Sequence, residues 1–171
     1  FAEYKENWEM DFSYSYKDRN RFRCNAYFQK GAPALVMRLI PGYIRSLSEL
    51  SLPDSLLEFT KYRQGFFLAV GPVGQGKTTT LAALIDYINS ERAEHIVTVE
   101  DPIEYLFESK KSVIYQREVG TDTANFHSGL KSAFRQDVDV ILVGEMRELE
   151  TISTAVTAGE TGHLVFSTLH T

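Results

Sequence analysis

The chain has 171 residues, 43% of them hydrophobic and 24% charged, which suits one globular domain or one domain with part of another. Its net charge of -5 argues against nucleic acid as a partner, because the surface as a whole does not attract phosphate backbones. A single cysteine, Cys24, excludes an intrachain disulfide framework and a cysteine-rich zinc site, and it is typical of a reducing compartment such as the cytoplasm.

Alternating apolar and polar residues near the start of the chain predict a small antiparallel sheet. Residues 8–16 alternate with the period of a half-buried strand, and residues 22–28 do so again after a polar turn, which predicts a hairpin. Residues 35–40 predict a third strand. Such a sheet needs a helix on one face, and we expect that helix upstream of Phe1.

From about residue 46 onward, predicted strands alternate with predicted helices. The apolar run at 66–70 ends at glycine and predicts a strand buried on both faces. The pattern predicts further strands at 95–99, 112–117, 140–143 and 163–168, and helices at 77–92, 125–136 and 148–158. It is typical of an α/β fold with a mostly parallel sheet and ligands at the carboxyl ends of the strands. We expect part of a small N-terminal subdomain at 1–42, a linker with a helix at 43–62, and an α/β core at 63–171.

Residues 71–78, GPVGQGKT, match the phosphate-binding pattern G-x-x-x-x-G-K-[ST]. Glycines let the backbone amides and the start of the next helix point at phosphates, while Lys77 would neutralise their oxygens and Thr78 would help to hold magnesium. An accidental match in a chain of this length is on the order of one per cent. The pattern therefore predicts binding of ATP and Mg2+ by the loop and the first turn after it: Gly71, Pro72, Val73, Gly74, Gln75, Gly76, Lys77, Thr78 and Thr79.

Two groups of acids follow predicted strands. Glu100, Asp101 and Glu104 come after one strand, and Glu145 comes after an unbroken apolar strand. Carboxylates at strand ends beside a phosphate loop are placed to hold a metal or to orient a water. For the first group, an acidic surface loop is the alternative explanation. We predict catalytic roles for Glu100, Glu104 and Glu145, and metal contacts for Asp101 and Glu145.

Two histidines and two arginines have weaker signals. His163 and His170 flank the last predicted strand, where they would sense the γ-phosphate or only pack and cap. Arg23 and Arg38 would share one face of the small sheet. A solvated arginine face is the ordinary explanation, and arginine fingers that reach a neighbouring subunit's nucleotide are the alternative.

Four segments resemble, in order, the signatures of the secretion-motor ATPases. They are GPVGQGKTTTLAALIDYIN for Walker A, HIVTVEDPIEYLFESKKSVIYQREVG for the aspartate box, DVILVGEMRELETI for an atypical Walker B, and TAGETGHLVFSTLHT for the histidine box. ESKKSVIYQREV and VGEMRELETI are closer to the type IV pilus retraction (PilT-like) branch than to the type II secretion or pilus assembly branches. Val138 and Glu148 depart from the family pattern, where proline and aspartate are common.

The resemblance implies a RecA-like core preceded by part of a PAS-like subdomain. It makes Glu104 the catalytic glutamate and Glu145 the Walker B acid. It also assigns the remaining candidates: the histidine-box pair His163 and His170, and the nucleotide-contacting pair Arg23 and Arg38.

The resemblance also implies a cytoplasmic, Mg-dependent ATPase that forms a homo-hexamer and powers pilus disassembly and twitching motility. It would act at the cytoplasmic face of the inner membrane through a pilus platform protein, without binding nucleic acid. We expect a soluble fragment, because no signal segment or membrane-spanning run is present and the family's C-terminal retraction motif would follow Thr171. The alternatives are a pilus assembly ATPase, a type II secretion ATPase, a nucleic-acid translocase and a scaffold that binds nucleotide without hydrolysing it.

Overall fold

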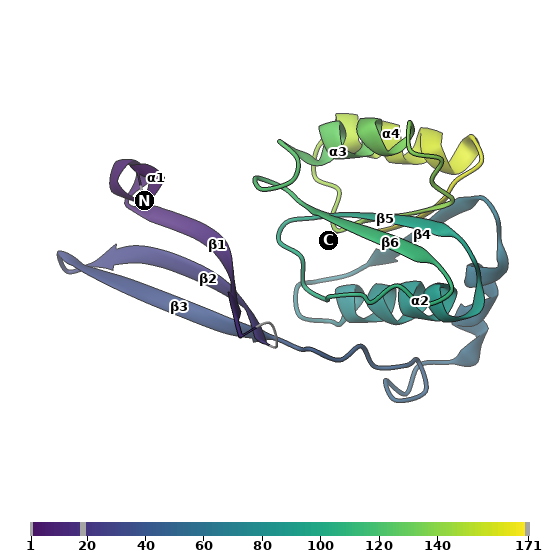
Figure 1. Ribbon diagram of the computed structural model, residues 1–171, viewed down its shortest axis with the longest axis horizontal. Helices are drawn as coiled ribbons and strands as arrows, with labels where there is room; N and C mark the ends of the chain where they lie inside the picture. The colour runs from purple at the N-terminus through teal and green to yellow at the C-terminus, as the bar shows by residue number, and fades with distance from the viewer. Residues whose placement is uncertain (1, 18–19, 170–171) are drawn as a thin grey trace. The chain divides into compact units, whose positions relative to one another are not determined.

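The computed structural model describes residues 2–17 and 20–169, and the chain divides into two compact units, Phe1–Tyr43 and Ile44–Thr171 (Figure 1). The first unit contains a small antiparallel sheet, and the second contains a five-stranded parallel sheet with helices. This confirms the predicted α/β class with its two kinds of sheet.

The first unit is a sheet of three antiparallel strands in the order β1 (Glu9–Tyr16), β2 (Asn20–Gln29) and β3 (Ala32–Ile40). The predicted hairpin and the third strand are confirmed. Register pairs Phe12 with Cys24 and Cys24 with Met37, so the alternating apolar residues share one face. β3 begins earlier than predicted and includes Pro33. Proline has no N–H to donate, and an edge strand such as β3 tolerates it because one side of the strand has no partner strand in this sheet.

A short helix, α1 (Ala2–Asn7), packs against this sheet. The ring of Tyr4 stacks on Phe28 with centroids 5.1 Å apart, and the Tyr4 hydroxyl donates to the carbonyl of Tyr27 at 3.2 Å. Sequence analysis did not predict this helix, and the expectation of a covering helix upstream of Phe1 stays a prediction. Six residues are fewer than two helical turns, so they show no periodicity that sequence analysis can detect.

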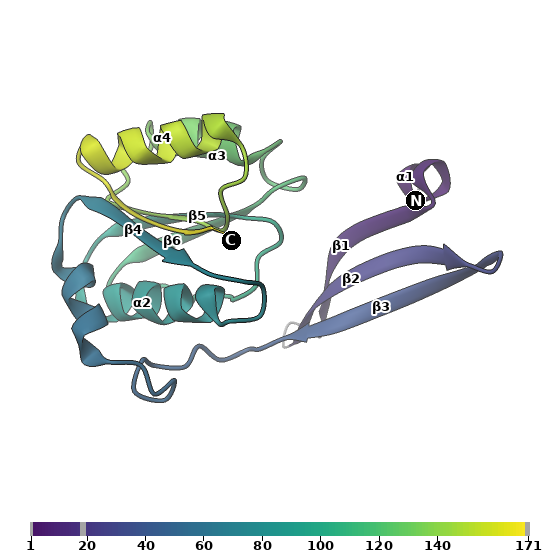
Figure 2. The same ribbon diagram turned by 180° about the vertical axis from the view of Figure 1, so that it is seen from behind.

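The second unit is a parallel sheet in the order β4-β8-β7-β5-β6 between two layers of helices (Figures 1 and 2). The strands are β4 (Gly65–Val70), β5 (His95–Glu100), β6 (Val113–Glu118), β7 (Val140–Val143) and β8 (Leu164–Leu169). α2 (Lys77–Glu91) covers one face, while α3 (Phe126–Ala133) and α4 (Leu149–Glu160) cover the other. All five strands and all three helices were predicted.

The segment predicted as a linker with a helix contains η1, a 3-10 helix at Asp54–Lys61. α2, with 15 residues, is the longest helix that the structure describes.

Within residues 2–17 and 20–169, no helix has both the length and the apolar character needed to cross a membrane.

The core of the second unit lies on both faces of the parallel sheet. Ile96 packs toward α2, whereas its neighbour Val97 packs toward α3 and α4. Val140 and Ile141 of β7 divide between the two faces in the same way. Because a strand covered on both sides is mostly apolar, β5, β7 and β8 consist mainly of apolar residues, with buried Thr98, Ser167 and Thr168 among the exceptions.

β4 departs from its prediction. It lies at the edge of the sheet and pairs with β8, and Val70 is 53% exposed and Phe66 36% exposed. The prediction that this strand is buried on both faces is wrong for the described residues. An apolar run identifies a strand but does not encode its position in the sheet, which depends on contacts with distant segments.

Candidate active site

The loop 71–76 joins β4 to α2 through a left-handed backbone that requires glycine. The φ angles of Gly71, Gly74 and Gly76 are 152°, 82° and 79°. L side chains rarely adopt such angles, and Gly76 adopts its own immediately before the helix. The first turn of α2 contains no acid, so its amide dipoles face the loop without a competing negative charge. This geometry is that of an anion-binding helix start.

The side chain of Lys77 folds back over the same loop. Its ammonium donates to the carbonyl of Gly71 at 2.8 Å and to that of Pro72 at 2.9 Å. A cation is thus held beside the amides of the helix start. The arrangement suits a phosphate. When phosphate binds, the ammonium would leave these carbonyls and donate to the phosphate oxygens instead.

The parallel strands place the phosphate loop and the acids at one edge of the sheet, the edge formed by the carboxyl ends of the strands. Gly71 donates its amide to the carbonyl of Leu169 at the end of β8, and Gly144 donates to the carbonyl of Val99 near the end of β5. A Cβ on Gly144 would lie 3.3 Å from the Cα of Glu100, so β7 and β5 end in close contact. The structure therefore brings the ends of four strands together at this edge.

Glu100 ends β5 and is almost fully buried, with 4% of its surface exposed. One carboxylate oxygen accepts the hydroxyl of Thr98 at 2.6 Å, and the other accepts the backbone amide of Glu104 at 3.4 Å. Burial raises the pKa of Glu100 to about 7, although these hydrogen bonds lower it. Both oxygens are engaged by protein donors, which favours a role in holding the Glu104 loop over direct contact with substrate.

The loop that carries Glu104 begins with a cis peptide bond between Asp101 and Pro102. A second buried acid, Glu118 at the end of β6, accepts the amide of Ile103 at 3.0 Å. Asp101 is exposed and Glu104 is half-buried. The loop is thus anchored through its backbone, and the carboxylate of Glu104 is not fully enclosed by protein.

Glu145 follows β7 at the same edge. Its side chain is 17% exposed and forms an ion pair with the exposed Arg147, with 3.0 Å between Oε1 and Nε. Thr168 of β8 holds the backbone on both sides of Glu145, because its hydroxyl donates to the carbonyl of Gly144 at 2.7 Å and its carbonyl accepts the amide of Met146. This position agrees with the expected acid after a buried strand.

His163 lies at the opposite edge of the sheet, where the amino ends of the strands lie, directly before β8 begins. The six residues of β8 separate it from the phosphate-loop edge by roughly 20 Å. Its Nδ1 lies 3.2 Å from the carbonyl of Ala158, and its ring packs 5.4 Å from that of Phe134. The structure therefore does not bring His163 to the candidate site and supports the packing explanation. His170 lies outside the described residues.

Arg23 and Arg38 face each other directly in the register of β2 and β3, and both are exposed. The prediction that they share one face of the small sheet is confirmed. Both belong to the first unit, so their contact with a nucleotide stays a prediction.

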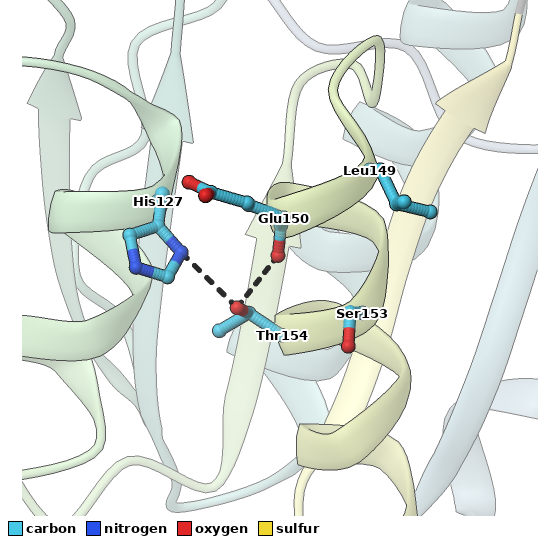
Figure 3. A pocket seen from close by; sticks show the side chains of 5 residues that line it. All are labelled: His127, Leu149, Glu150, Ser153 and Thr154. Carbon is cyan, nitrogen blue, oxygen red and sulfur yellow. Dashed lines mark hydrogen bonds between the residues drawn. The ribbon is translucent and has the colours of Figure 1, made fainter.

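A shallow depression lies on the outer surface of α3 and α4 (Figure 3). His127 Nδ1 lies 3.2 Å from the hydroxyl of Thr154, which donates to the carbonyl of Glu150 at 2.7 Å. The remaining lining residues are Leu149 and Ser153. None of the predicted site residues lines this depression.

The donor set at the phosphate-loop edge fits magnesium that arrives with phosphate. Within the described residues, no group of three or more His, Cys, Asp or Glu side chains forms a metal cage. Magnesium is commonly held by one or two carboxylates or hydroxyls together with substrate phosphates and water. Thr78, Asp101 and Glu145 carry hard oxygen atoms of this kind, and their contact with magnesium stays a prediction.

Sequence analysis missed the side chains that anchor the Glu104 loop: Thr98, Tyr105, Gln116 and Glu118. The sequence pattern around a polar residue in a strand does not show which distant residue it will bond to. Buried polar positions in the otherwise apolar strand β5, such as Thr98, were the one available hint.

The fold and the loop define this chain as a P-loop α/β protein. Residues 13–171 match the family described as Type II/IV secretion system protein, and the chain belongs to this family.

Within this family, the chain is similar to proteins of twitching motility and pilus retraction, as two relatives and one solved structure show. The chain is 52% identical over 168 residues to a "Twitching motility protein" of Neisseria gonorrhoeae, covering 98% of this chain and 45% of the relative. It is 48% identical over 169 residues to the type IV pilus retraction ATPase PilT of Pseudomonas aeruginosa, covering 99% of this chain and 49% of the relative. A crystal structure of the pilus retraction motor PilT with bound ADP matches with a TM-score of 0.96 and 50% identity, over 99% of this chain and 50% of that one. The chain thus spans about half the length of these proteins.

Proposed function

We propose that the protein containing this chain is an ATP-hydrolysing motor subunit of the pilus retraction type. The observation that carries the proposal is the glycine-lined loop with Lys77 folded over it, at the same sheet edge as the Glu104 loop and Glu145. Its relatives support the proposal, because they are named for twitching motility and pilus retraction and a PilT structure holds ADP.

The proposed reaction transfers the γ-phosphoryl group of ATP to water. The loop amides and Lys77 hold the phosphate oxygens, and Glu104 orients the water and accepts its proton. Magnesium, held by Thr78, Glu145 and Asp101, would neutralise charge on the phosphates. Arg23 and Arg38 of a neighbouring subunit would stabilise the charge of the transferred group, as arginine fingers do.

The proposed assembly is a homo-hexamer at the cytoplasmic face of the inner membrane. Hydrolysis would shift the position of the small-sheet unit relative to the P-loop unit, because ATP and ADP make different contacts and therefore favour different states. A pilus platform protein would transmit this motion to disassemble the pilus and drive twitching motility. The subunit would reach the membrane only through such partners, and it would bind no nucleic acid.

ATP turnover of the whole protein tests the proposed function. Lys77→Ala removes the charge that stabilises the phosphoryl oxygens, and Glu104→Ala removes the base, so each is expected to lower kcat by at least about 100-fold. Lys61→Ala, which removes an exposed lysine paired with Glu58, is the control and should leave turnover unchanged. Near-normal turnover in the Lys77→Ala or Glu104→Ala variant would contradict the assignment.

A further inference from the structure

We infer that Gln116 is a positioning residue that fixes Glu104 for hydrolysis by clamping the loop that carries it. The inference rests on the proposed function. Gln116 lies on β6, at the edge of the parallel sheet, and it is half-buried. Sequence analysis assigned it no role, and its side chain forms two hydrogen bonds with the loop that carries Glu104 and one with Glu100 of β5.

The amide of Gln116 uses both its donor and its acceptor on the backbone of one loop. Its Nε2 donates to the carbonyl of Tyr105 at 2.7 Å, and its Oε1 accepts the amide of Phe107 at 2.9 Å. The pair of bonds spans Leu106 and fixes the backbone that directly follows Glu104. The planar amide of glutamine offers a donor and an acceptor at this length, whereas an ionised glutamate offers acceptors only.

The same Nε2 also donates to Glu100 Oε1 at 3.3 Å. Glu100 in turn accepts the backbone amide of Glu104 at 3.4 Å. Gln116 therefore contacts the residue that follows Glu104 directly and the amide of Glu104 through one intermediate. The two contacts restrain the Glu104 backbone from both sides.

The clamped loop is also joined to the phosphate-loop helix. The hydroxyls of Tyr105 and Thr79 are hydrogen-bonded at 2.9 Å, and Thr79 follows Lys77 and Thr78 in the first turn of α2. A continuous set of hydrogen bonds thus runs from β6 through the Glu104 loop to the helix that holds the phosphates. A displacement of about 1 Å in a reacting group can cost about 100-fold in rate, so this restraint matters to catalysis more than to binding.

The test compares Gln116→Met, which keeps the volume and removes all three hydrogen bonds, with Gln136→Met, the same change at an exposed glutamine after α3. In the whole protein, Gln116→Met is expected to lower kcat by about 10- to 100-fold while the affinity for Mg-ADP changes by less than about threefold. Gln136→Met should match the wild type. Gln116→Glu keeps the acceptor for Phe107 and loses the donor, so its kcat should also fall.

A double variant separates positioning from general support of the fold. If Gln116 acts through Glu104, adding Gln116→Met to Glu104→Ala should cause no further loss of residual single-turnover rate. An additional loss as large as in the wild-type background would overturn the inference, as would a kcat within twofold of wild type in both Gln116 variants. If Gln116→Met does not fold, Gln116→Glu decides alone. A wild type without turnover would overturn the proposed function, whereas an active wild type with unaffected Gln116 variants would overturn this inference only.

Discussion

Two buried acids, Glu100 and Glu118, lie beneath the Glu104 loop and accept its backbone amides. Carboxylates in such positions are expensive to bury, and they persist here because amide and hydroxyl donors surround them. Their oxygens accept the amides of Ile103 and Glu104, which lie outside the strands of the sheet. At the residue scale, the position of the Glu104 loop therefore depends on buried acids that hold its backbone.

The pKa of Glu100 gives a prediction about stability. The folded protein holds this proton until about pH 7, whereas the unfolded chain releases it near the ordinary value of 4.5. Stability relative to a variant without this group is therefore greatest below pH 4.5 and falls as the pH rises toward 7.

Glu100→Gln removes the titrating proton. Between pH 5 and pH 8, the unfolding free energy of the wild type should fall relative to that of the variant by up to about 3 kcal/mol. Urea titrations of the whole protein at both pH values, with EDTA present, measure the difference. A difference that does not change with pH would show that Glu100 titrates normally.

At the element scale, the sequence determined most of the second unit. Strands β5, β7 and β8 were predicted because a strand buried on both faces is mostly apolar. The phosphate loop was predicted because few residues other than glycine adopt a left-handed backbone, so the glycine pattern identifies the loop. Two features were not predicted: the edge position of β4 and the short helix α1. Each depends on contacts between distant segments, which local patterns do not record.

The packing of α4 on β4 gives a second prediction. A Cβ on Gly159 would lie 3.1 Å from the carbonyl oxygen of Gly65 and 3.4 Å from Phe66 Cβ. The backbone of Gly65 cannot move aside as a flexible side chain would, so α4 would have to shift. Overpacking of this kind costs about 1–3 kcal/mol, against a gain of about 1 kcal/mol in helix propensity.

Gly159→Ala should therefore lower the Tm of the whole protein by a few degrees. Ser153→Ala, at an exposed position of the same helix, is the matched control and should leave the Tm equal or slightly higher. Differential scanning fluorimetry of both variants is sufficient. A Tm for Gly159→Ala at or above that of wild type would show that α4 is free to move.

At the scale of the whole molecule, the two units contribute different parts of the proposed machine. The P-loop unit contains Lys77, Thr78, Glu104 and Glu145, whereas the small-sheet unit presents its paired arginines on one face. A site that takes groups from two units, or from two subunits, responds to their relative motion. In the proposed function, this response would link nucleotide hydrolysis to force.

The candidate site was predictable in its phosphate-binding part and much less in its supporting part. The residues of the phosphate loop are contiguous in sequence, so their pattern identifies them. Gln116 and Tyr105 meet only after folding, and no spacing rule relates them to Thr79. The resemblance to a motor family supplied the roles of Glu104 and of the arginines, which composition alone left open.

The measurement that tests the central claim most directly is calorimetric titration of the whole protein with ATP or ADP in the presence of magnesium. We expect saturable binding by the wild type, and binding weakened by at least about tenfold in Lys77→Ala, because the ammonium is the cation that the loop places beside the phosphates. No heat of binding from folded wild-type protein would contradict the account, and so would equal affinity in the two proteins.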